Sequence, residues 1–251
     1  MKDIQGTVVL VTGASRGIGA AVATILAARG ADVVVNYRSK GPRASEVAAA
    51  VEAHGRRALL AQADLTDPAE LTAMAASIGA TFGRLDVVVL NASGGLEKDK
   101  PGDYAMVLNR DAQVATLEHV LPLLTDGGTV VFVTSHWAHF YGRQAVYPGY
   151  ERVAESKRAG EDALRAAIPA LAERGIRLIV VSGDVIEGTI TPRLLERSQP
   201  GLLNARRSQA GTPLPTVADF ATAIVDSITD QSLASGDVVF VGPTDEFPAA
   251  E

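Results

Sequence analysis

Short runs of β-branched and other apolar residues alternate along the chain with longer stretches in which apolar residues recur at helical spacing. The apolar runs predict strands at Thr7–Thr12, Asp32–Tyr37, Arg57–Gln62, Asp86–Leu90, Gly128–Thr134, Ile176–Val181 and Asp237–Val241. The stretches between them predict helices at Gly17–Arg29, Pro42–His54, Asp67–Phe82, Asp103–Leu124, Tyr150–Arg174 and Thr216–Thr229. This alternation is typical of an α/β fold, a doubly wound parallel sheet of seven strands with helices on both faces.

The 251 residues are predicted to form a single domain. Hydrophobic residues make up 47% of the chain, which is enough for one large core, and sheets of this class commonly reach this size undivided. Residues 183–215 show no clear periodicity and contain several glycines and prolines. We expect this stretch to be a mobile lid over the substrate.

Charge and composition narrow the possible partners. The 23 Lys and Arg residues are outnumbered by 29 Asp and Glu residues, which argues against nucleic acid or an anionic membrane. The absence of cysteine excludes disulfides, thiolate chemistry and cysteine-ligated zinc. No signal peptide or membrane span can be recognised, so a cytoplasmic location is expected.

A glycine-rich turn, Thr12-Gly-Ala-Ser-Arg-Gly-Ile-Gly19, follows the first predicted strand and precedes a predicted helix. Such a turn brings backbone N–H groups and a helix N-terminus close to a phosphate, and within a βαβ unit it indicates a dinucleotide. The residues expected to contact the dinucleotide here are Gly13, Ser15, Arg16, Gly17, Ile18 and Gly19.

The second predicted strand ends in Asn36-Tyr37-Arg38, without the carboxylate that would bind the ribose 2′-hydroxyl of NAD. Arg16 and Arg38 are suited to hold a 2′-phosphate, so NADP(H) is the expected cofactor. The alternative is that both arginines are solvated surface residues. Asp64, after the third strand, is expected beside the adenine amino group or, alternatively, to be a capping residue of a loop.

The order and spacing of the motifs resemble the short-chain dehydrogenase/reductase family over nearly the whole chain. The residues that carry the resemblance are the glycine turn, Asp64, Leu85-Asp86, Asn91-Ala92-Ser93-Gly94, Asn109, Ser135 and Ser156-Lys157. The resemblance implies a Rossmann-like fold that binds NAD(P) and uses Ser, Tyr and Lys, assisted by Asn, for catalysis. It also implies that the cofactor contacts Leu65, Asn91, Ala92, Ser93, Lys157 and Thr189.

The same resemblance assigns roles to the catalytic residues. Ser135 would hydrogen-bond the substrate carbonyl, and Asn109 would hold a water that relays protons. Lys157 would bind the nicotinamide ribose and lower the pKa of the catalytic tyrosine, because a free phenol titrates near pH 10.

The tyrosine itself departs from the family pattern. The usual Tyr-x-x-x-Lys spacing would place it at position 153, which is Val153, and the nearest tyrosine before it is Tyr150. On a continuous helix, Tyr150 and Lys157 would share a face about 10 Å apart at Cα. This Tyr-x6-Lys spacing resembles the enoyl-acyl-carrier-protein reductase branch, which makes Tyr150 the expected proton donor.

The segment between Ser135 and Lys157 is longer than is usual in the family, and the added residues are expected to line or cover the pocket. Tyr147 is a rival proton donor, and His136 or His139 could substitute for it since imidazole titrates near neutral pH. The two histidines lack a third ligand nearby, so pocket lining is preferred to metal binding. The other aromatic residues of this segment are Trp137 and Tyr141.

These observations predict an NADPH-dependent ketoreductase similar to 3-oxoacyl-carrier-protein reductases. The alternatives are an enoyl-thioester reductase and a non-catalytic NADP-sensing regulator, which would have no need to keep Ser135, Lys157 and Asn109. The substrate is expected to be a small carbonyl or enoyl compound, free or bound to a carrier protein. A homodimer or homotetramer is expected to form through the predicted helices Asp103–Leu124 and Tyr150–Arg174, because both have apolar residues on more than one face. Those of the first helix are the clearest. These residues are Val107, Leu108, Val114, Leu117 and Val120.

Overall fold

The structure is a computed structural model that describes residues 3–97, 100–245 and 247–248. In these residues one sheet of seven parallel strands has the order β3-β2-β1-β4-β5-β6-β7. The strands are β1 (Val8–Val11), β2 (Asp32–Tyr37), β3 (Ala58–Gln62), β4 (Leu85–Leu90), β5 (Leu124–Ser135), β6 (Arg177–Gly183) and β7 (Val238–Val241). The predicted fold class and all seven predicted strands are confirmed.

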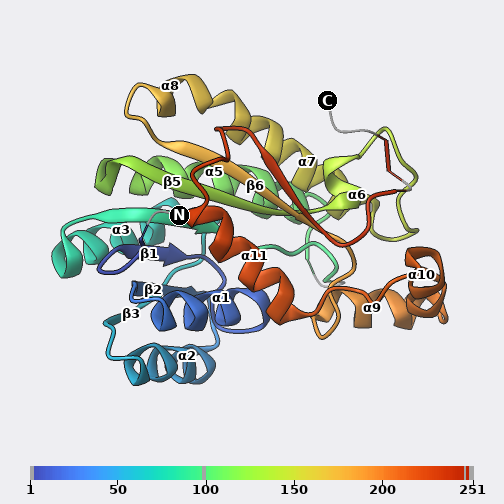
Figure 1. The fold of residues 1–251 in the computed structure, drawn as a ribbon, viewed down its shortest axis with the longest axis horizontal. Helices are drawn as coiled ribbons and strands as arrows, with labels where there is room; N and C mark the ends of the chain where they lie inside the picture. The colour runs from blue at the N-terminus through green and yellow to red at the C-terminus, as the bar shows by residue number, and fades with distance from the viewer. Residues whose placement is uncertain (1–2, 98–99, 246, 249–251) are drawn as a thin grey trace.

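Helices cover both faces of the sheet (Figure 1). The long ones are α1 (Gly17–Ala28), α2 (Gly41–Ala53), α3 (Pro68–Phe82), α5 (Ala112–Val120), α7 (Glu151–Ala166), α9 (Ile190–Ser198), α10 (Leu202–Ala210) and α11 (Val217–Thr229). The short ones are α4 (Tyr104–Met106), the π-helical η1 (Val107–Asp111), the 3-10 helix η2 (Leu121–Leu123), α6 (His136–His139) and α8 (Ile168–Ala172). Among the described residues, no helix combines the length and the apolar character that are needed to cross a bilayer.

Successive side chains of a strand point to opposite faces of the sheet, so the core is divided into two layers. In β1, Val9 and Val11 pack with residues of α1, α2 and α11, whereas Val8 and Leu10 pack with residues of α3, α5 and α7. Both faces of the central strands are therefore buried, as expected for a parallel sheet covered by helices. A third apolar cluster lies beyond the carboxyl ends of the strands and includes Trp137, Tyr150, Leu195 and Leu202.

Two of the predicted helices are wrong as single helices. Asp103–Leu124 is divided into α4, η1, α5 and η2, and its last residue already belongs to β5. The π-helical turn lies where the backbone approaches α7 closely: a Cβ on Gly160 would be 2.1 Å from the Asn109 carbonyl oxygen. Tyr150–Arg174 is divided into α7 and α8 next to Pro169, whose ring cannot continue the helical hydrogen bonding.

Residues 183–215 are more ordered in secondary structure than the sequence indicated. They contain α9 and α10, which lie beyond the carboxyl edge of the sheet near α6 (Figure 1). Each helix has only nine residues, and glycines at 201 and 211 flank α10, so helical periodicity is too brief to stand out. Leu195 and Leu202 anchor these helices in the third apolar cluster.

Candidate active site

A groove of about 770 Å³ runs along the carboxyl ends of the strands and passes the point between β1 and β4 where the strand order reverses. Ligands of open α/β sheets bind at this point. Nearly all of the site residues expected from the sequence line this one groove. They are Gly13, Ser15, Arg16, Gly17, Ile18, Gly19, Asn36, Tyr37, Arg38, Asp64, Leu65, Asn91, Ala92, Ser93, Ser135, Tyr150, Lys157 and Thr189.

The N-terminus of α1 faces the groove without a side-chain cap. Arg16 at the N-cap position makes no capping hydrogen bond, and the first turn has no acidic residue. In contrast, Asp67 caps α3 through the N–H groups of Ala69 and Glu70. The first N–H groups of α1 and the helix dipole therefore remain available to an anion in the groove.

The glycines of the turn allow the backbone to come close to a ligand and to its own neighbours. A Cβ on Gly19 would lie 2.6 Å from the Gly13 carbonyl oxygen, and Gly13 has a φ of 64°. A side chain at either position would push α1 away from β1 or strain the turn. The residues present therefore fit the pyrophosphate of a dinucleotide.

Three polar side chains fix the turn between the strand ends. The Thr12 hydroxyl accepts hydrogen bonds from the N–H groups of Asn91 and Ala92, and Asn91 Nδ2 donates to the Thr12 carbonyl at 2.8 Å. Asn36 Oδ1 accepts from the Gly13 N–H at 3.1 Å, while its Nδ2 donates to the carbonyls of Ala61 and Ala63. These bonds join the ends of β1, β2, β3 and β4 and give the groove a fixed floor.

The end of the groove beside β2 is basic. Arg16 and Arg38 line it, as expected, together with Lys40 and Arg43, which the sequence-based prediction missed. The run of basic residues that continues after Arg38 was a readable signal for both. Arg38 Nη1 also donates to the hydroxyl of Tyr104 in α4 at 2.6 Å, a contact that the sequence did not predict.

Asp64 lies in the groove and also stabilises its own loop. Oδ1 accepts hydrogen bonds from the N–H and the hydroxyl of Thr66, while Oδ2 is 3.9 Å from Arg38 Nη1. Asp64 therefore stabilises its loop, as in the alternative interpretation, and also lines the groove, whereas its place beside the adenine amino group stays a prediction.

Ser135 and Tyr150 form a hydrogen-bonded pair in the groove, with 3.1 Å between Oγ and Oη. Tyr150 occupies the N-cap position of α7 and is 6% exposed. Burial raises the pKa of its phenol above 10, and the hydrogen bond to Ser135 acts in the opposite direction. Ser135 ends β5, and its hydroxyl caps α6 through the Ala138 N–H, which fixes the pair.

Lys157 is buried in the same groove and donates from Nζ to the Val133 carbonyl at 3.0 Å. Burial lowers the pKa of its ammonium to about 8. The described residues contain no hydrogen bond between Lys157 and Tyr150, and the pKa of Tyr150 is raised. The expected lowering of the tyrosine pKa by Lys157 is therefore not present in this structure.

Asn109 does not line the groove but lies directly behind it. Its Nδ2 donates to the Gly94 carbonyl and to the Ser156 hydroxyl, both at 2.9 Å, and its Oδ1 accepts from the Gly94 N–H. Asn109 thereby joins η1 to α7 and to the loop after β4.

The aromatic insertion divides into two groups. Trp137 and Tyr147 line the groove, whereas His136 and His139 do not, so the expectation that the histidines line the pocket is wrong. His136 Nδ1 lies 2.9 Å from Ser182 Oγ, and burial lowers the pKa of the imidazole to about 3. His139 Nδ1 lies 2.9 Å from buried Glu161. Neither histidine is placed to donate a proton to a ligand.

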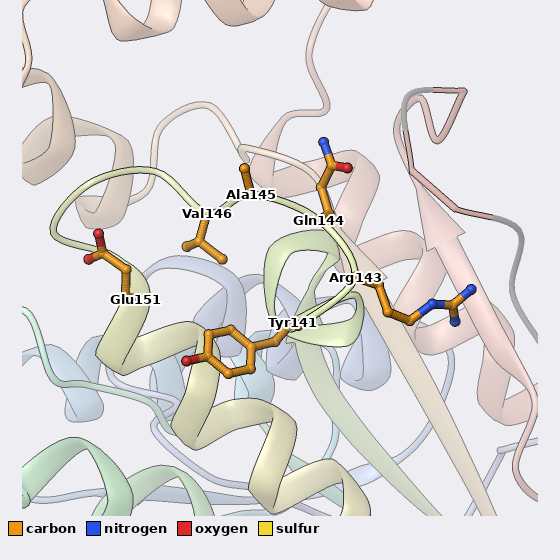
Figure 2. Close-up of a pocket in the computed structure, with 7 residues that line it drawn as sticks. Tyr141, Arg143, Gln144, Ala145, Val146 and Glu151 are labelled. Atoms are coloured by element: carbon orange, nitrogen blue, oxygen red, sulfur yellow. The ribbon is translucent and has the colours of Figure 1, made fainter.

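A second, shallow hollow of about 540 Å³ lies on the outer side of the insertion and is lined by Tyr141, Val146 and Glu151 among others. Figure 2 shows that the Arg143 side chain points away from Glu151, so the polar groups of this hollow do not converge. Among the described residues, no group of three His, Asp or Glu side chains could hold a metal ion. The groove, and not this hollow, is therefore the candidate active site.

The profile of the short chain dehydrogenase family matches residues 7–198, and the chain belongs to this family. It is 34% identical over 206 residues to hydroxynaphthalene reductase arp2 of Aspergillus fumigatus, covering 79% of this chain and 73% of that protein. Hydroxynaphthalene reductase-like proteins of several Metarhizium species are matched over 61% of their length.

Two solved structures share the fold over nearly the whole chain. A short chain dehydrogenase from Burkholderia cenocepacia in complex with NADP has a TM-score of 0.83 and 29% identity, covering 96% of this chain and 98% of the other. The angucycline C-6 ketoreductase LanV with bound NADP has a TM-score of 0.79 and 27% identity, covering 95% of each chain. The predicted family and enzyme class are confirmed, and these two neighbours agree with the predicted cofactor, NADP(H).

Proposed function

We propose that this protein is an NADPH-dependent ketoreductase in which Ser135 and Tyr150 bind the carbonyl oxygen of the substrate. The observation that carries the proposal is the hydrogen-bonded Ser135–Tyr150 pair, which lies with Lys157 in one groove beside a phosphate-binding turn. The ketoreductase among the structural neighbours and the hydroxynaphthalene reductase among the relatives support carbonyl reduction.

The basic end of the groove supports the preference for a phosphorylated dinucleotide. Arg16, Arg38, Lys40 and Arg43 line it, and guanidinium groups bind phosphate with two parallel hydrogen bonds. Arg38 would exchange its hydrogen bond to Tyr104 for the 2′-phosphate or share it between both. Lys157 would contact the nicotinamide ribose, since it lies in the groove next to Ser135 and Tyr150.

In the Ser135–Tyr150 pair, Tyr150 is the residue that would give its proton to the substrate oxygen. Ser135 Oγ and Tyr150 Oη are 3.1 Å apart, so a carbonyl oxygen placed against both would accept a hydrogen bond from each once their mutual hydrogen bond is exchanged. NADPH held along the groove by the glycine turn, Arg16 and Arg38 would supply the hydride for the carbonyl carbon. Tyr150 donates its proton to the oxygen, which completes the alcohol. Lys157 would still be cationic at neutral pH, because burial lowers the pKa of its ammonium only to about 8.

The replacement Tyr150→Phe tests this assignment. It should lower kcat for ketone reduction by roughly 100-fold or more, the usual scale of general acid catalysis, and leave the Kd for NADPH unchanged. Tyr147→Phe is the matched control and should remain active, since the hydroxyl paired with Ser135 belongs to Tyr150 and not to Tyr147. Full activity in Tyr150→Phe together with loss in Tyr147→Phe would overturn the assignment.

Enoyl-thioester reduction is the second candidate, and the position of the tyrosine favours it. Val153 occupies the position of the usual family tyrosine and lines the groove, whereas Tyr150 lies at the start of α7. Steady-state rates on a ketone and on a crotonyl thioester, measured with NADPH, separate the two reactions. Adding Val153→Tyr to Tyr150→Phe should restore part of the ketone reduction if only the position of the hydroxyl matters.

A further inference from the structure

The substrate end of the groove has an aromatic wall. Trp137 and Tyr147 both line the groove, and their ring centroids are 4.7 Å apart with an interplanar angle of 38°. Trp137 follows Ser135 by two residues and belongs to the same apolar cluster as Tyr150. The wall therefore stands directly beside the groups proposed to bind the carbonyl oxygen.

The remaining surface at this end is mainly apolar. Leu96, Val153, Val185 and Leu195 line it, and Val153, Val185 and Leu195 pack in the same cluster as Trp137. The carboxylate of Asp184 is paired with Arg206 and is fully buried, so it does not offer a free charge to a substrate. This apolar part of the lining suits an apolar ring system.

Trp137 is held in place from behind. The Arg206 guanidinium carbon lies 5.3 Å from the centre of the Trp137 ring, and the Phe247 ring meets it edge-on at 5.4 Å. Arg206 is itself fixed by Asp184, with 2.9 Å between Nε and Oδ1 and 2.7 Å between Nη2 and Oδ2. A ring fixed on several sides loses little further freedom when a ligand stacks on it.

We propose that Trp137 and Tyr147 form a stacking wall that selects ketones on a planar aromatic ring system, and that the buried Arg206–Asp184 pair holds this wall in place. The inference rests on the proposed ketoreductase function and specifies its substrate class. A planar ring can lie against the wall while its carbonyl oxygen reaches Ser135 and Tyr150. A saturated ring of the same size is puckered and has no π face, so it loses this contact.

Two bicyclic ketones that share a skeleton test the proposal. α-Tetralone has an aromatic ring next to its carbonyl, and α-decalone is its saturated counterpart. The wild-type enzyme should have the lower KM for α-tetralone, and Trp137→Leu should lower the ratio of kcat/KM for α-tetralone over α-decalone by roughly 10-fold. Tyr141→Leu, which removes an aromatic ring of the same insertion outside the groove, should leave the ratio unchanged.

Trp137 is the only tryptophan of the chain, so its fluorescence reports on the wall without turnover. In the presence of NADP⁺, α-tetralone should quench this fluorescence at concentrations near its KM, and α-decalone should not. Tyr147→Leu keeps the fluorophore and should weaken α-tetralone binding several-fold, which gives a second measurement if Trp137→Leu fails to fold.

The two arms separate the failure of this inference from failure of the proposed function. Reduction of both ketones with a ratio that Trp137→Leu does not change would overturn the wall and leave the ketoreductase intact. Quenching by both ketones alike would also overturn it. Selective quenching by α-tetralone without reduction of any ketone would support the wall and overturn the proposed function.

Discussion

His136 shows how its surroundings decide the chemistry of a residue. Its sequence position beside Ser135 suggested a proton donor, but its ring is fully buried between Ser182, Phe240 and Phe247. Burial is the main cause that lowers the pKa of this imidazole to about 3, and the positive charge of Arg206 contributes. His136 is therefore neutral in the folded protein over the whole physiological range.

This neutral histidine makes stability depend on pH. Its pKa is about 3 in the folded chain and about 6.5 in the unfolded chain, so the unfolded state takes up a proton first as the pH falls. The contribution of His136 is fully present above pH 6.5 and decreases toward pH 3. Between pH 7 and pH 4.5 the wild-type protein should lose roughly 2–3 kcal/mol more unfolding free energy than His136→Gln.

Urea unfolding at the two pH values measures this difference. His54→Gln is the control, because His54 is exposed and should show the same pH dependence as the wild type. An equal loss in the wild type and in His136→Gln would show that the buried imidazole does not control acid stability.

At the scale of elements, the strands were more predictable than the helices. The central strands β1, β2 and β4 contain apolar runs because both of their faces are buried, and such runs are visible in the sequence. The division of Asp103–Leu124 was not visible, since it depends on the contact between Asn109 and Gly160, which are far apart in the chain. α9 and α10 were missed because each is brief.

The site was predictable to the extent that it lies at strand ends. The glycine turn, Asn91 and Ser135 follow apolar runs directly, so the topology of a parallel sheet brings them together. Trp137 was expected to line or cover the pocket with the rest of its insertion, and it lines the groove. Tyr104 could not be assigned to the groove from the sequence, because its position depends on how α4 packs. That His139 lies outside the groove could not be predicted either, because its side chain pairs with Glu161, which is 22 residues away in the chain.

α10 is joined to the loop after β6 by two ion pairs of very different environment. Arg206 and Asp184 are buried, whereas Arg207 and Glu187 are exposed at 50% and 36% of their side chains. Loss of one partner of a buried pair leaves an uncompensated charge and typically costs about 3–5 kcal/mol, whereas an exposed pair contributes about 0–1 kcal/mol.

Arg206→Met should therefore loosen α9 and α10, and Arg207→Met on the same helix should not. We expect Arg206→Met to lower the unfolding free energy by roughly 3 kcal/mol or to expose residues 190–210 to limited proteolysis. Arg207→Met should stay within about 1 kcal/mol of the wild type. Equal sensitivity of the two variants to urea and to protease would show that the buried pair does not anchor these helices.

At the scale of the whole molecule, the apolar surface available for assembly is narrower than the sequence indicated. Leu108, Leu117 and Val120 are buried in the core of their own chain, because η1 and α5 pack on the sheet and on α7. Val107 and Val114 are only partly covered. The helix pair formed by α5 and α7 is therefore still the face on which we expect a second copy to pack, through a small apolar centre with a polar rim.

Light scattering at micromolar concentration tests this expectation, and it should return at least twice the 26.1 kDa mass of one chain. Val114→Arg places a charge in the apolar centre of the expected interface and should shift the protein to the monomer mass, because an unpaired charge is costly to bury there. Ala76→Arg, on an exposed position of α3, should leave the mass unchanged. A wild-type mass near 26.1 kDa would exclude assembly at this concentration. Retention of the oligomer mass by Val114→Arg would place the interface on another face of the molecule.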